Sequence, residues 1–137
     1  MKKQLIVLFT LATISLISLT SCEPFITNKI TVRNLAAGDV QLNLRANLYN
    51  IPAGETFVLN DFKKGTFEYT TTYSLPAGTT EFSTDGDVSG QFVLNAGTEI
   101  VLLYSSTFID NKYTIYGALT SSDDVNRSDP FVDPNSP

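Results

Sequence analysis

The chain predicts an all-β protein, an antiparallel β-sandwich of about seven or eight short strands with immunoglobulin-like architecture. Two observations lead to this prediction. Apolar and polar residues alternate with a period of two along much of residues 29–120, which is the pattern of half-buried strands. Turn residues separate these stretches at intervals of about 8–12 residues, as they do in sandwiches. Because the chain has no Trp and one Cys, the prediction concerns architecture and not the Cys–Trp–Cys pattern of true immunoglobulin domains.

The first half of the domain contains the clearest alternation. Val40, Leu42 and Leu44 alternate with polar residues, so one face of this strand is expected to be buried. Threonines and aromatic residues fill residues 66–74, and this composition favours a pleated strand over a helix. The predicted strands of this half are 29–33, 40–45, 48–51, 57–60 and 66–74, with turns at 35–39 and 61–65.

The second half contains an unbroken apolar run, Ile100–Tyr104, which predicts a central strand buried on both faces. In the last strand, Tyr113 and Ile115 are expected to point inward and Tyr116 to face the opposite way. The predicted strands of this half are 81–83, 88–94, 99–108 and 112–120, with turns at 84–87 and 110–111.

Three similar turns connect predicted strands, at Ile51–Thr56, Leu75–Thr80 and Leu94–Glu99. Each has an aliphatic residue, a Pro or Asn, then Ala-Gly, then two residues drawn from Thr and Glu. Their spacings of 24 and 19 residues are too uneven for a solenoid or propeller repeat. We interpret them as strand connections, turns in which Pro fixes φ near −65° at the second position and Gly takes the fourth.

The N-terminus has the three parts of a secretory signal. Lys2 and Lys3 precede an apolar run from Leu5 to Leu19, which small residues follow. A transmembrane helix needs roughly 20 apolar residues, and this run of about 15 is shorter. An uncleaved N-terminal anchor, or an ordinary signal that is cleaved a few residues away, would be the alternative interpretation.

The stretch Leu19-Thr20-Ser21-Cys22 resembles the lipobox of bacterial lipoproteins, in which an aliphatic residue and two small residues precede the lipidated cysteine. The resemblance covers residues 1–22. It implies that residues 1–21 are removed as a signal peptide, that Cys22 receives three acyl chains, palmitate among them, and that residues 22–28 form a lipidated tether. Two or more acyl chains hold a protein stably at a membrane. The implied location is the bacterial cell envelope. Glu23 stands where an Asp would retain an enterobacterial lipoprotein at the inner membrane, which favours the outer membrane in a Gram-negative organism.

The mature chain is acidic and ends in a polar segment. Loss of Lys2 and Lys3 with the signal leaves 7 basic against 14 acidic residues, a formal charge of about −7. Such a domain repels phosphate backbones and anionic head groups, so nucleic acid is not expected as a partner and the acyl chains form the membrane contact. Residues 121–137 are acidic and contain Pro, and they predict a disordered tail.

The sequence predicts no catalytic residue, no metal site and no cofactor, and therefore no enzyme. His-based chemistry is excluded because the chain has no His. Two carboxylate pairs, Asp85/Asp87 and Asp123/Asp124, are better explained as turn formers and solubilising charge. Asp85 and Asp87 are also weak candidates for a calcium loop, but the third acid and the Glu of an EF-hand are missing.

These observations favour a non-catalytic, lipid-anchored envelope β-sandwich that acts as a structural or protein-interaction module. A carbohydrate-binding surface lipoprotein is the first alternative, in which the aromatic rings of Tyr69, Tyr73 and Tyr116 would contact the ligand. A small envelope inhibitor of a lysozyme or protease is the second. The expected partners are the membrane, through the lipidated N-terminus, and an envelope protein or glycan.

Overall fold

Nine strands and one short helix make up residues 27–125, the part of the chain that the computed structural model describes. The all-β prediction is confirmed, with nine strands instead of about seven or eight. Their bounds are β1 (Asn28–Leu35), β2 (Val40–Leu44), β3 (Asn47–Ile51), β4 (Thr56–Phe62), β5 (Gly65–Tyr73), β6 (Glu81–Gly86), β7 (Gly90–Leu94), β8 (Glu99–Ile109), β9 (Lys112–Ser121) and α2 (Ser122–Val125).

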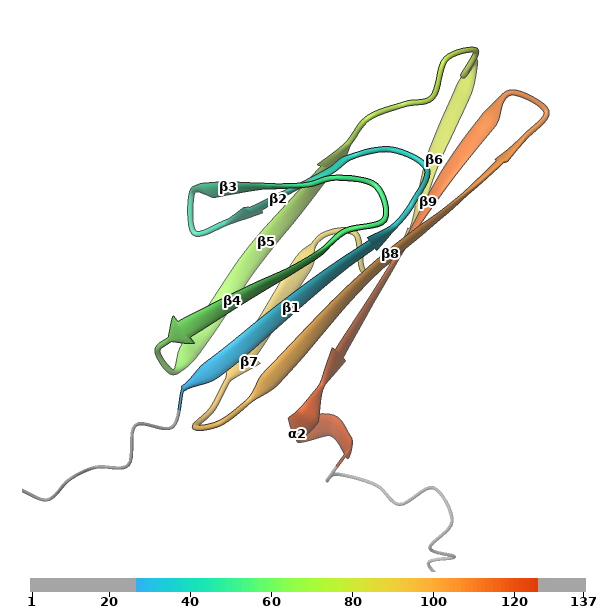
Figure 1. Ribbon diagram of the computed structural model, residues 1–137. Coiled ribbons are helices and arrows are strands. Elements are labelled where there is room, and N and C mark those ends of the chain that lie inside the picture. Colours follow the sequence, from blue (N-terminus) through green and yellow to red (C-terminus); the bar gives the residue numbers. More distant parts are fainter. Residues whose placement is uncertain (1–26, 126–137) are drawn as a thin grey trace, which may run out of the picture.

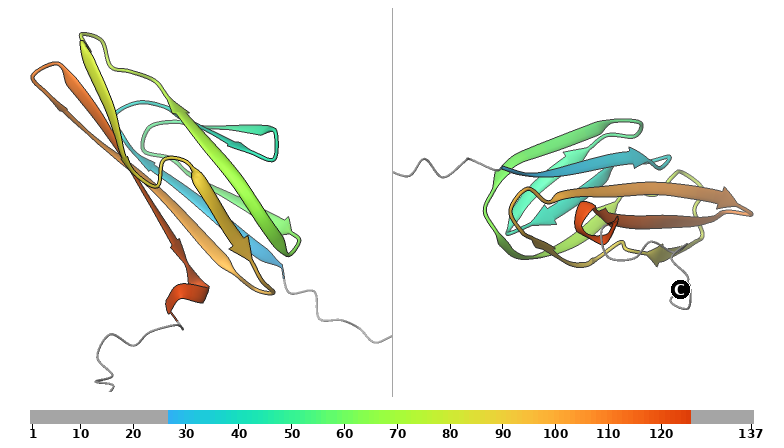
Figure 2. Two further views of the ribbon diagram at one scale, coloured as in Figure 1. Left: turned by 180° about the vertical axis from the view of Figure 1, so that it is seen from behind. Right: turned by 90° about the horizontal axis from the view of Figure 1, so that it is seen from below.

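The strands form two sheets packed face to face, as Figures 1 and 2 show. One sheet has five strands in the order β4-β1-β8-β9-β6, and the other has four in the order β3-β2-β5-β7. The four-stranded sheet is antiparallel throughout. The five-stranded sheet is mixed, because β1 runs parallel to β8 and β6 runs parallel to β9. The sandwich is therefore established, and its immunoglobulin-like character stays a prediction.

The core lies between the two sheets and follows the period-two pattern of the sequence. Alternate residues of β2 are buried, as are alternate residues of β1, β8 and the first part of β9. Each fully buried Leu or Ile side chain contributes about 1.5–3 kcal/mol relative to exposure. The largest completely buried side chains are Tyr104, Tyr113, Phe67, Ile30, Leu42, Leu44, Ile51, Leu94, Ile100, Leu102, Ile115 and Val32.

The three similar turns connect strands as predicted, but the positions predicted for Pro and Gly within the turn, second and fourth, are wrong. Gly54, Gly78 and Gly97 have positive φ angles of 83°, 86° and 77°, which an L-residue with a side chain rarely adopts. In the first turn the backbone N–H of Glu55 donates to the carbonyl of Pro52 at 3.1 Å. The proline therefore occupies the first position of the four-residue turn, and the glycine provides the required conformation at the third.

Two predicted turns are placed differently. β4 continues to Phe62 and β5 begins at Gly65, so the turn predicted at 61–65 is reduced to two residues. Asp61 has a φ of 66°, and the pairing of β4 with β1 shifts register beside it, which indicates a bulge and not a turn. The turn predicted at 84–87 begins later, because pairing with β9 extends β6 to Gly86.

The prediction for Ile100–Tyr104 is half wrong. These residues do form the central strand of a sheet, since β8 is third of five. Ile100 and Leu102 are completely buried, but Val101 on the opposite face is 40% exposed. A two-layer sandwich covers only one face of each sheet, so even a central strand has an outer face toward solvent.

The structure differs from the predicted disordered tail at its first residues. Ser121 is the last residue of β9, and α2 (Ser122–Val125) continues directly from it. The rest of that segment, residues 126–137, lies outside the described part of the chain, as do residues 1–26 with the predicted signal peptide and most of the tether.

A buried asparagine joins two loops at one end of the sandwich. Asn34 is completely buried, and its Nδ2 donates to the carbonyls of Gly38 and Ile51, each at 2.9 Å. Its Oδ1 accepts the N–H of Ala36 at 2.9 Å. Every polar atom of this side chain is therefore paired, which is the condition for burying an amide without a large loss of stability.

Candidate functional site

Two of the three aromatic candidates face the interior. The hydroxyl of Tyr69 donates to the backbone carbonyl of Asp87 at 2.9 Å, and its side chain is almost completely buried. Burial, together with the nearby Tyr104 and Asp87, raises the pKa of Tyr69 to about 12. Tyr73 is half-buried, and its ring centroid lies 5.9 Å from that of Tyr113. Tyr69 and Tyr73 therefore pack the sandwich and do not form an exposed aromatic platform.

Tyr116, the third candidate, is exposed as its position in the sequence predicts. Its side chain is 37% exposed on the outer face of β9, and its hydroxyl lies 3.4 Å from Thr107 Oγ1. A shallow hollow of about 410 Å³ lies beside it, lined by Glu81, Thr107, Ile109, Asp110, Lys112, Thr114 and Tyr116.

The Asp85/Asp87 pair is divided between two environments. Asp85 is exposed on the edge strand β6. The carboxylate of Asp87 instead accepts the backbone N–H of Leu119 at 3.0 Å, and the backbone N–H of Asp87 donates to the carbonyl of Gly117 at 2.8 Å. Asp87 thus attaches the bend at residues 87–89 to β9. Within residues 27–125, no group of three or more His, Cys, Asp or Glu residues could hold a metal ion.

The Asp123/Asp124 pair is divided in the same way. Asp123 Oδ2 accepts from Asn95 Nδ2 at 2.7 Å and from Thr98 Oγ1 at 2.9 Å. Asp124 is exposed. The first carboxylate therefore fastens α2 to the turn between β7 and β8, which gives Asp123 a structural role that the sequence pattern did not indicate.

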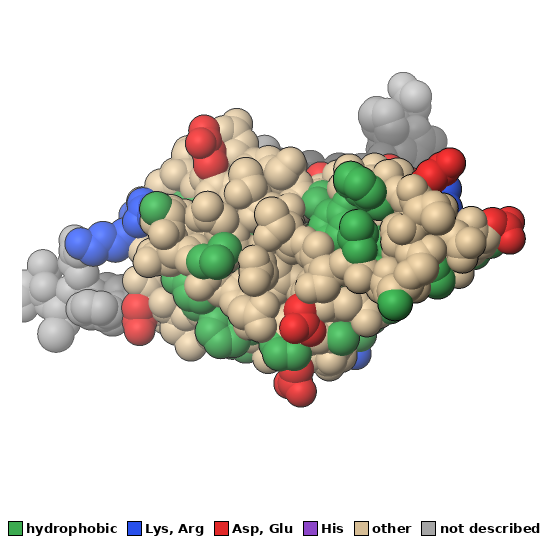
Figure 3. All heavy atoms as spheres, turned by 90° about the horizontal axis from the view of Figure 1, so that it is seen from above, with side chains coloured by type: hydrophobic (Ala, Val, Ile, Leu, Met, Phe, Trp, Pro, Cys, Tyr) green, Lys and Arg blue, Asp and Glu red, His purple; other side chains and the backbone are tan. Residues whose placement is uncertain are grey.

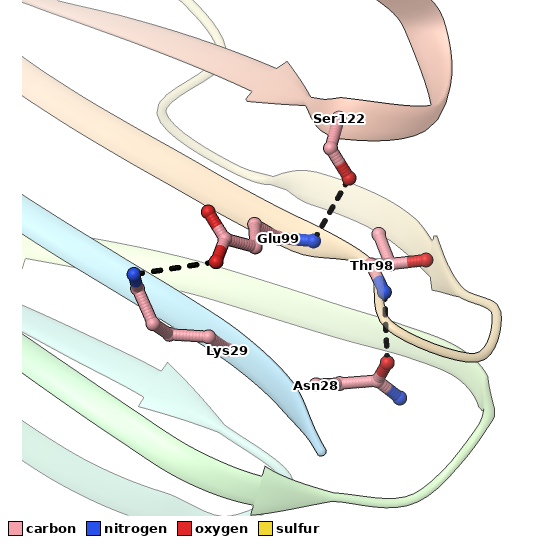
Figure 4. A network of polar contacts seen from close by, with 5 residues as sticks. All are labelled: Asn28, Lys29, Thr98, Glu99 and Ser122. Carbon is pink, nitrogen blue, oxygen red and sulfur yellow. Dashed lines mark hydrogen bonds and ion pairs between the residues drawn. The ribbon is translucent and has the colours of Figure 1, made fainter. Parts of the chain in front are cut away.

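The same end of the molecule contains a further polar network, which Figure 4 shows. The N–H of Thr98 donates to the buried Asn28 Oδ1 at 2.9 Å, and the N–H of Glu99 donates to Ser122 Oγ at 3.0 Å. Lys29 Nζ lies 3.4 Å from Glu99 Oε1, and these two residues are the first register pair of the parallel strands β1 and β8. The start of β8 is therefore fastened both to β1 and to the chain that follows β9.

The opposite end has a feature that sequence reasoning missed. Strands β6, β8 and β9 extend beyond the four-stranded sheet, as Figure 1 shows. We call this part, residues 81–83, 106–109 and 112–114, the overhang. Phe82 and Phe108 are both register partners of Tyr113, so the three side chains share one face. Tyr113 is completely buried, whereas Phe82 is 65% and Phe108 is 43% exposed.

The overhang arises from unequal strand lengths. β8 and β9 have 11 and 10 residues, whereas β5, the longest strand of the opposite sheet, has 9. The ring of Tyr73 at the end of β5 reaches Tyr113, and beyond it the four-stranded sheet ends. The predicted strand lengths did not contain this signal, because residues 66–74 and 112–120 were both predicted as strands of nine residues.

Apolar side chains are also exposed elsewhere, for example Val58 and Val101, which are both register partners of Thr31 on the outer face of the five-stranded sheet. Figure 3 shows separate hydrophobic patches on the face seen from above, with backbone and other side chains between them. Single exposed apolar residues are normal on soluble domains, whereas neighbouring ones can indicate an interaction site. Phe82 and Phe108 satisfy this second description because they flank Tyr113, and Val58 and Val101 do so beside Thr31; of these two pairs the first is aromatic.

The predicted lipidation site, Cys22, lies outside the described residues, as does Glu23. α2, the one helix that the structure describes in residues 27–125, has four residues, and no described helix is long and apolar enough to cross a bilayer.

No protein-family model matches this chain, and neither the curated proteins nor the solved structures include a match.

Proposed function

We propose that this protein is a non-catalytic, lipid-anchored β-sandwich of the bacterial cell envelope that binds another envelope protein. The observation that carries the proposal is the overhang. Its two exposed phenylalanines, Phe82 and Phe108, flank the buried Tyr113, on which Tyr73 at the end of the opposite sheet packs. Aromatic side chains in such positions are typical anchors of protein interfaces.

The position of the overhang supports this proposal. β1 begins and α2 ends at the end of the sandwich away from the overhang, as Figure 1 shows. A chain spans at most about 3.3–3.6 Å per residue, so the few residues between Cys22 and β1 would keep that end within roughly 20 Å of the membrane. A lipid on Cys22 would therefore leave the overhang at the end far from the bilayer, where a partner can reach it.

Site-specific photocrosslinking in the producing cells tests the interaction. A photoreactive phenylalanine analogue at position 82 or 108 should yield a discrete crosslinked protein. The matched control carries the analogue at Val58, which is 45% exposed on the outer face of β4. Crosslinks of equal yield from all three positions, or none from positions 82 and 108, would contradict the proposed binding surface.

The anchor is tested separately. The intact mass of the native protein should show cleavage before Cys22 and the addition of acyl chains, and membrane fractionation should place it in the envelope. Cys22→Ser should release the mature domain from membranes or leave the signal uncleaved. In a Gram-negative producer we expect the outer-membrane fraction. A soluble, unlipidated wild-type protein would overturn this part of the proposal.

A second candidate function, saccharide binding, is supported by the hollow beside Tyr116. An exposed ring bordered by Thr107, Lys112 and Glu81 combines a stacking surface with hydrogen-bond donors and acceptors, as sugar recognition requires. A glycan array decides between the candidates. Tyr116→Ala should abolish saccharide binding. The control Leu48→Ala, at an exposed position of β3, should leave it intact. A blank array would exclude it.

A further inference from the structure

The outer edge of β7 has no strand beside it among the described residues. β7 pairs with β5 along Gly90–Leu94 and is the last strand of its sheet. An edge strand carries a row of backbone N–H and C=O groups that can pair with another chain. The strand reads Gly-Gln-Phe-Val-Leu, without charge or Pro, and its pairing with β5 has no register shift. It therefore lacks the features that usually protect an edge.

The other three edges are less open to a new strand. β4 has a positive φ at Asp61 and a register shift beside it. β6 carries Glu81 and Asp85, and charges on an edge oppose pairing. On the inner face of β3, the Tyr49 ring packs against Phe57 of β4 with centroids 5.8 Å apart. An added strand would find this space beside the β3 edge occupied. β7 is thus the edge of the described sandwich best suited to pairing.

A hollow of about 400 Å³ lies between β7 and the end of β9. It exists because β6 pairs with β9 only as far as Gly117, so the last residues of β9 have no described strand beside them on that side, where the Asp87 carboxylate accepts a hydrogen bond from the N–H of Leu119. Phe92, Ile100 and Leu119 contribute apolar atoms to the hollow, and Asp123 and Asp124 stand at its border. The side chains that line it include no Lys or Arg.

We propose that β7 accepts an extended peptide strand from a protein partner, and that this peptide carries an apolar side chain followed by a basic one. The strand would add to the four-stranded sheet by backbone hydrogen bonds, which is a recognised mode of peptide binding. Alternate side chains of a strand point to opposite faces, so one apolar side chain enters the hollow while its neighbours lie along the exposed Val93. The two carboxylates at the border select a Lys or Arg.

This surface is separate from the overhang. β7 ends near α2, at the opposite end of the molecule, as Figure 2 shows in its left view. The proposal therefore goes beyond the function proposed above and does not depend on it. It assigns a second contact, of defined chemistry, to the side of the sandwich that the crossing from β6 to β7 leaves open.

A random peptide library displayed on phage tests the proposal, with the full chain in detergent as the bait. Enriched peptides should alternate apolar and polar residues and contain Lys or Arg. Hydrogen–deuterium exchange of the full chain with a synthetic copy of the best peptide should then show slower exchange at residues 90–94. Val93→Lys, which places a charge on the edge, should weaken binding about tenfold or more. Asp124→Asn should weaken it about two- to fivefold and reduce its salt dependence.

The matched control is Asp110→Asn. It also removes one exposed carboxylate, at a position with a φ of 51° that Asn tolerates, and it lies in the β8–β9 turn far from the hollow. It should leave peptide affinity unchanged. Three results would overturn the proposal: no enriched peptide, peptides that bind Val93→Lys as well as wild type, or protection that maps to β3, β4 or the overhang instead of β7. Since Val93→Lys and Asp124→Asn leave the overhang unchanged, the photocrosslinks from positions 82 and 108 should persist in these two variants.

Discussion

Gly86 and Gly117 approach so closely that neither position has room for a methyl group. A Cβ on Gly86 would overlap the carbonyl oxygen of Gly117, and a Cβ on Gly117 would lie 2.6 Å from the carbonyl group of Asp87. Here the chain leaves β6 in one sheet and crosses to β7 in the other. The two glycines therefore allow the crossing from β6 to β7. After this crossing no described strand pairs with the last residues of β9 on that side.

Substitution at this crossing should destabilise the fold. Gly117→Ala should lower the free energy of unfolding by about 2–3 kcal/mol, because the backbone of the bend at residues 87–89 must move to admit the methyl group. Gly90→Ala is the control, since its nearest neighbours are atoms of the Tyr69 ring at 3.7–3.9 Å, and it should change stability by less than about 1 kcal/mol. Urea unfolding measures both. Equal effects would show that the crossing is not tightly packed.

Asn34→Ala should be among the most destabilising polar substitutions. It would leave the carbonyls of Gly38 and Ile51 and the N–H of Ala36 without this partner. The free energy of unfolding should fall by about 3 kcal/mol in total. Asn50→Ala, at an exposed position of β3, should change the free energy of unfolding by about 0.5 kcal/mol or less. A loss below about 1 kcal/mol in Asn34→Ala would mean that water replaces the amide readily.

Loss of the hydroxyl should affect stability differently at two buried tyrosines. The hydroxyl of Tyr104 lies 2.7 Å from Thr71 Oγ1, so Tyr104→Phe should cost about 1 kcal/mol. The hydroxyl of Tyr113 is buried with no hydrogen-bond partner among the described residues, so Tyr113→Phe should leave stability unchanged or raise it. Thermal unfolding of the two variants compares them directly. A loss of stability in Tyr113→Phe equal to that in Tyr104→Phe would indicate a bound water.

Stability should fall in alkaline solution because of Tyr69. Its pKa in the folded protein is about 12, against 10.0 in the unfolded chain, so the folded state holds the proton more tightly. The contribution is fully present below pH 10 and is lost as the pH rises through 12, which amounts to about 2–3 kcal/mol at most. Burial raises the pKa of Tyr104 and of Tyr73 in the same direction.

Urea unfolding between pH 9 and pH 12 measures this dependence. Tyr69→Phe should be less stable than wild type at pH 9 by about 1 kcal/mol, since the hydrogen bond to Asp87 is lost. It should also show a shallower decline above pH 10, because one fewer proton is released on unfolding. Parallel curves for the two proteins would contradict the raised pKa.

Asp123 should hold the C-terminal turn in place. Asp123→Ala removes the acceptor for Asn95 Nδ2 and Thr98 Oγ1 and should cost about 1–2 kcal/mol. Hydrogen–deuterium exchange should accelerate at Ser122–Val125 and in the β7–β8 turn, while β1 to β6 stay protected. Asp124→Ala, which removes a neighbouring exposed carboxylate, should leave exchange unchanged. Unaltered exchange in Asp123→Ala would show that other contacts hold α2.

The sequence predicts the strands well because their local pattern follows from burial on one face. Val40, Leu42 and Leu44 alternate, and all three are buried. The same pattern does not specify a strand's neighbours, since burial on one face is compatible with many sheet orders. The parallel pairs β1–β8 and β6–β9 therefore could not be read from alternation. The exposure of Val101 was missed for a related reason, because an apolar run does not reveal how many layers cover it.

The candidate sites were predicted less well than the fold. Tyr116 was correctly expected to be exposed, whereas Tyr69 and Tyr73 point inward. The sequence places both tyrosines on the same strand face as Phe67, which is completely buried. This shared face was the available signal that the two tyrosines point inward. The roles of Asp87 and Asp123 depend on contacts with Leu119 and Thr98, which come from segments distant in sequence.

β1 takes its place inside the five-stranded sheet only by pairing with β8, a strand far along the chain. β1 lies between β4 and β8 in the five-stranded sheet, and its partners in β8 are 70 residues later, as with Lys29 and Glu99. Such distant contacts form late because a long loop must close first. The sheet cannot be completed until the last third of the chain has been delivered. In a chain exported from its N-terminus, as the proposed signal requires, β1 would emerge well before the strand that becomes its parallel neighbour.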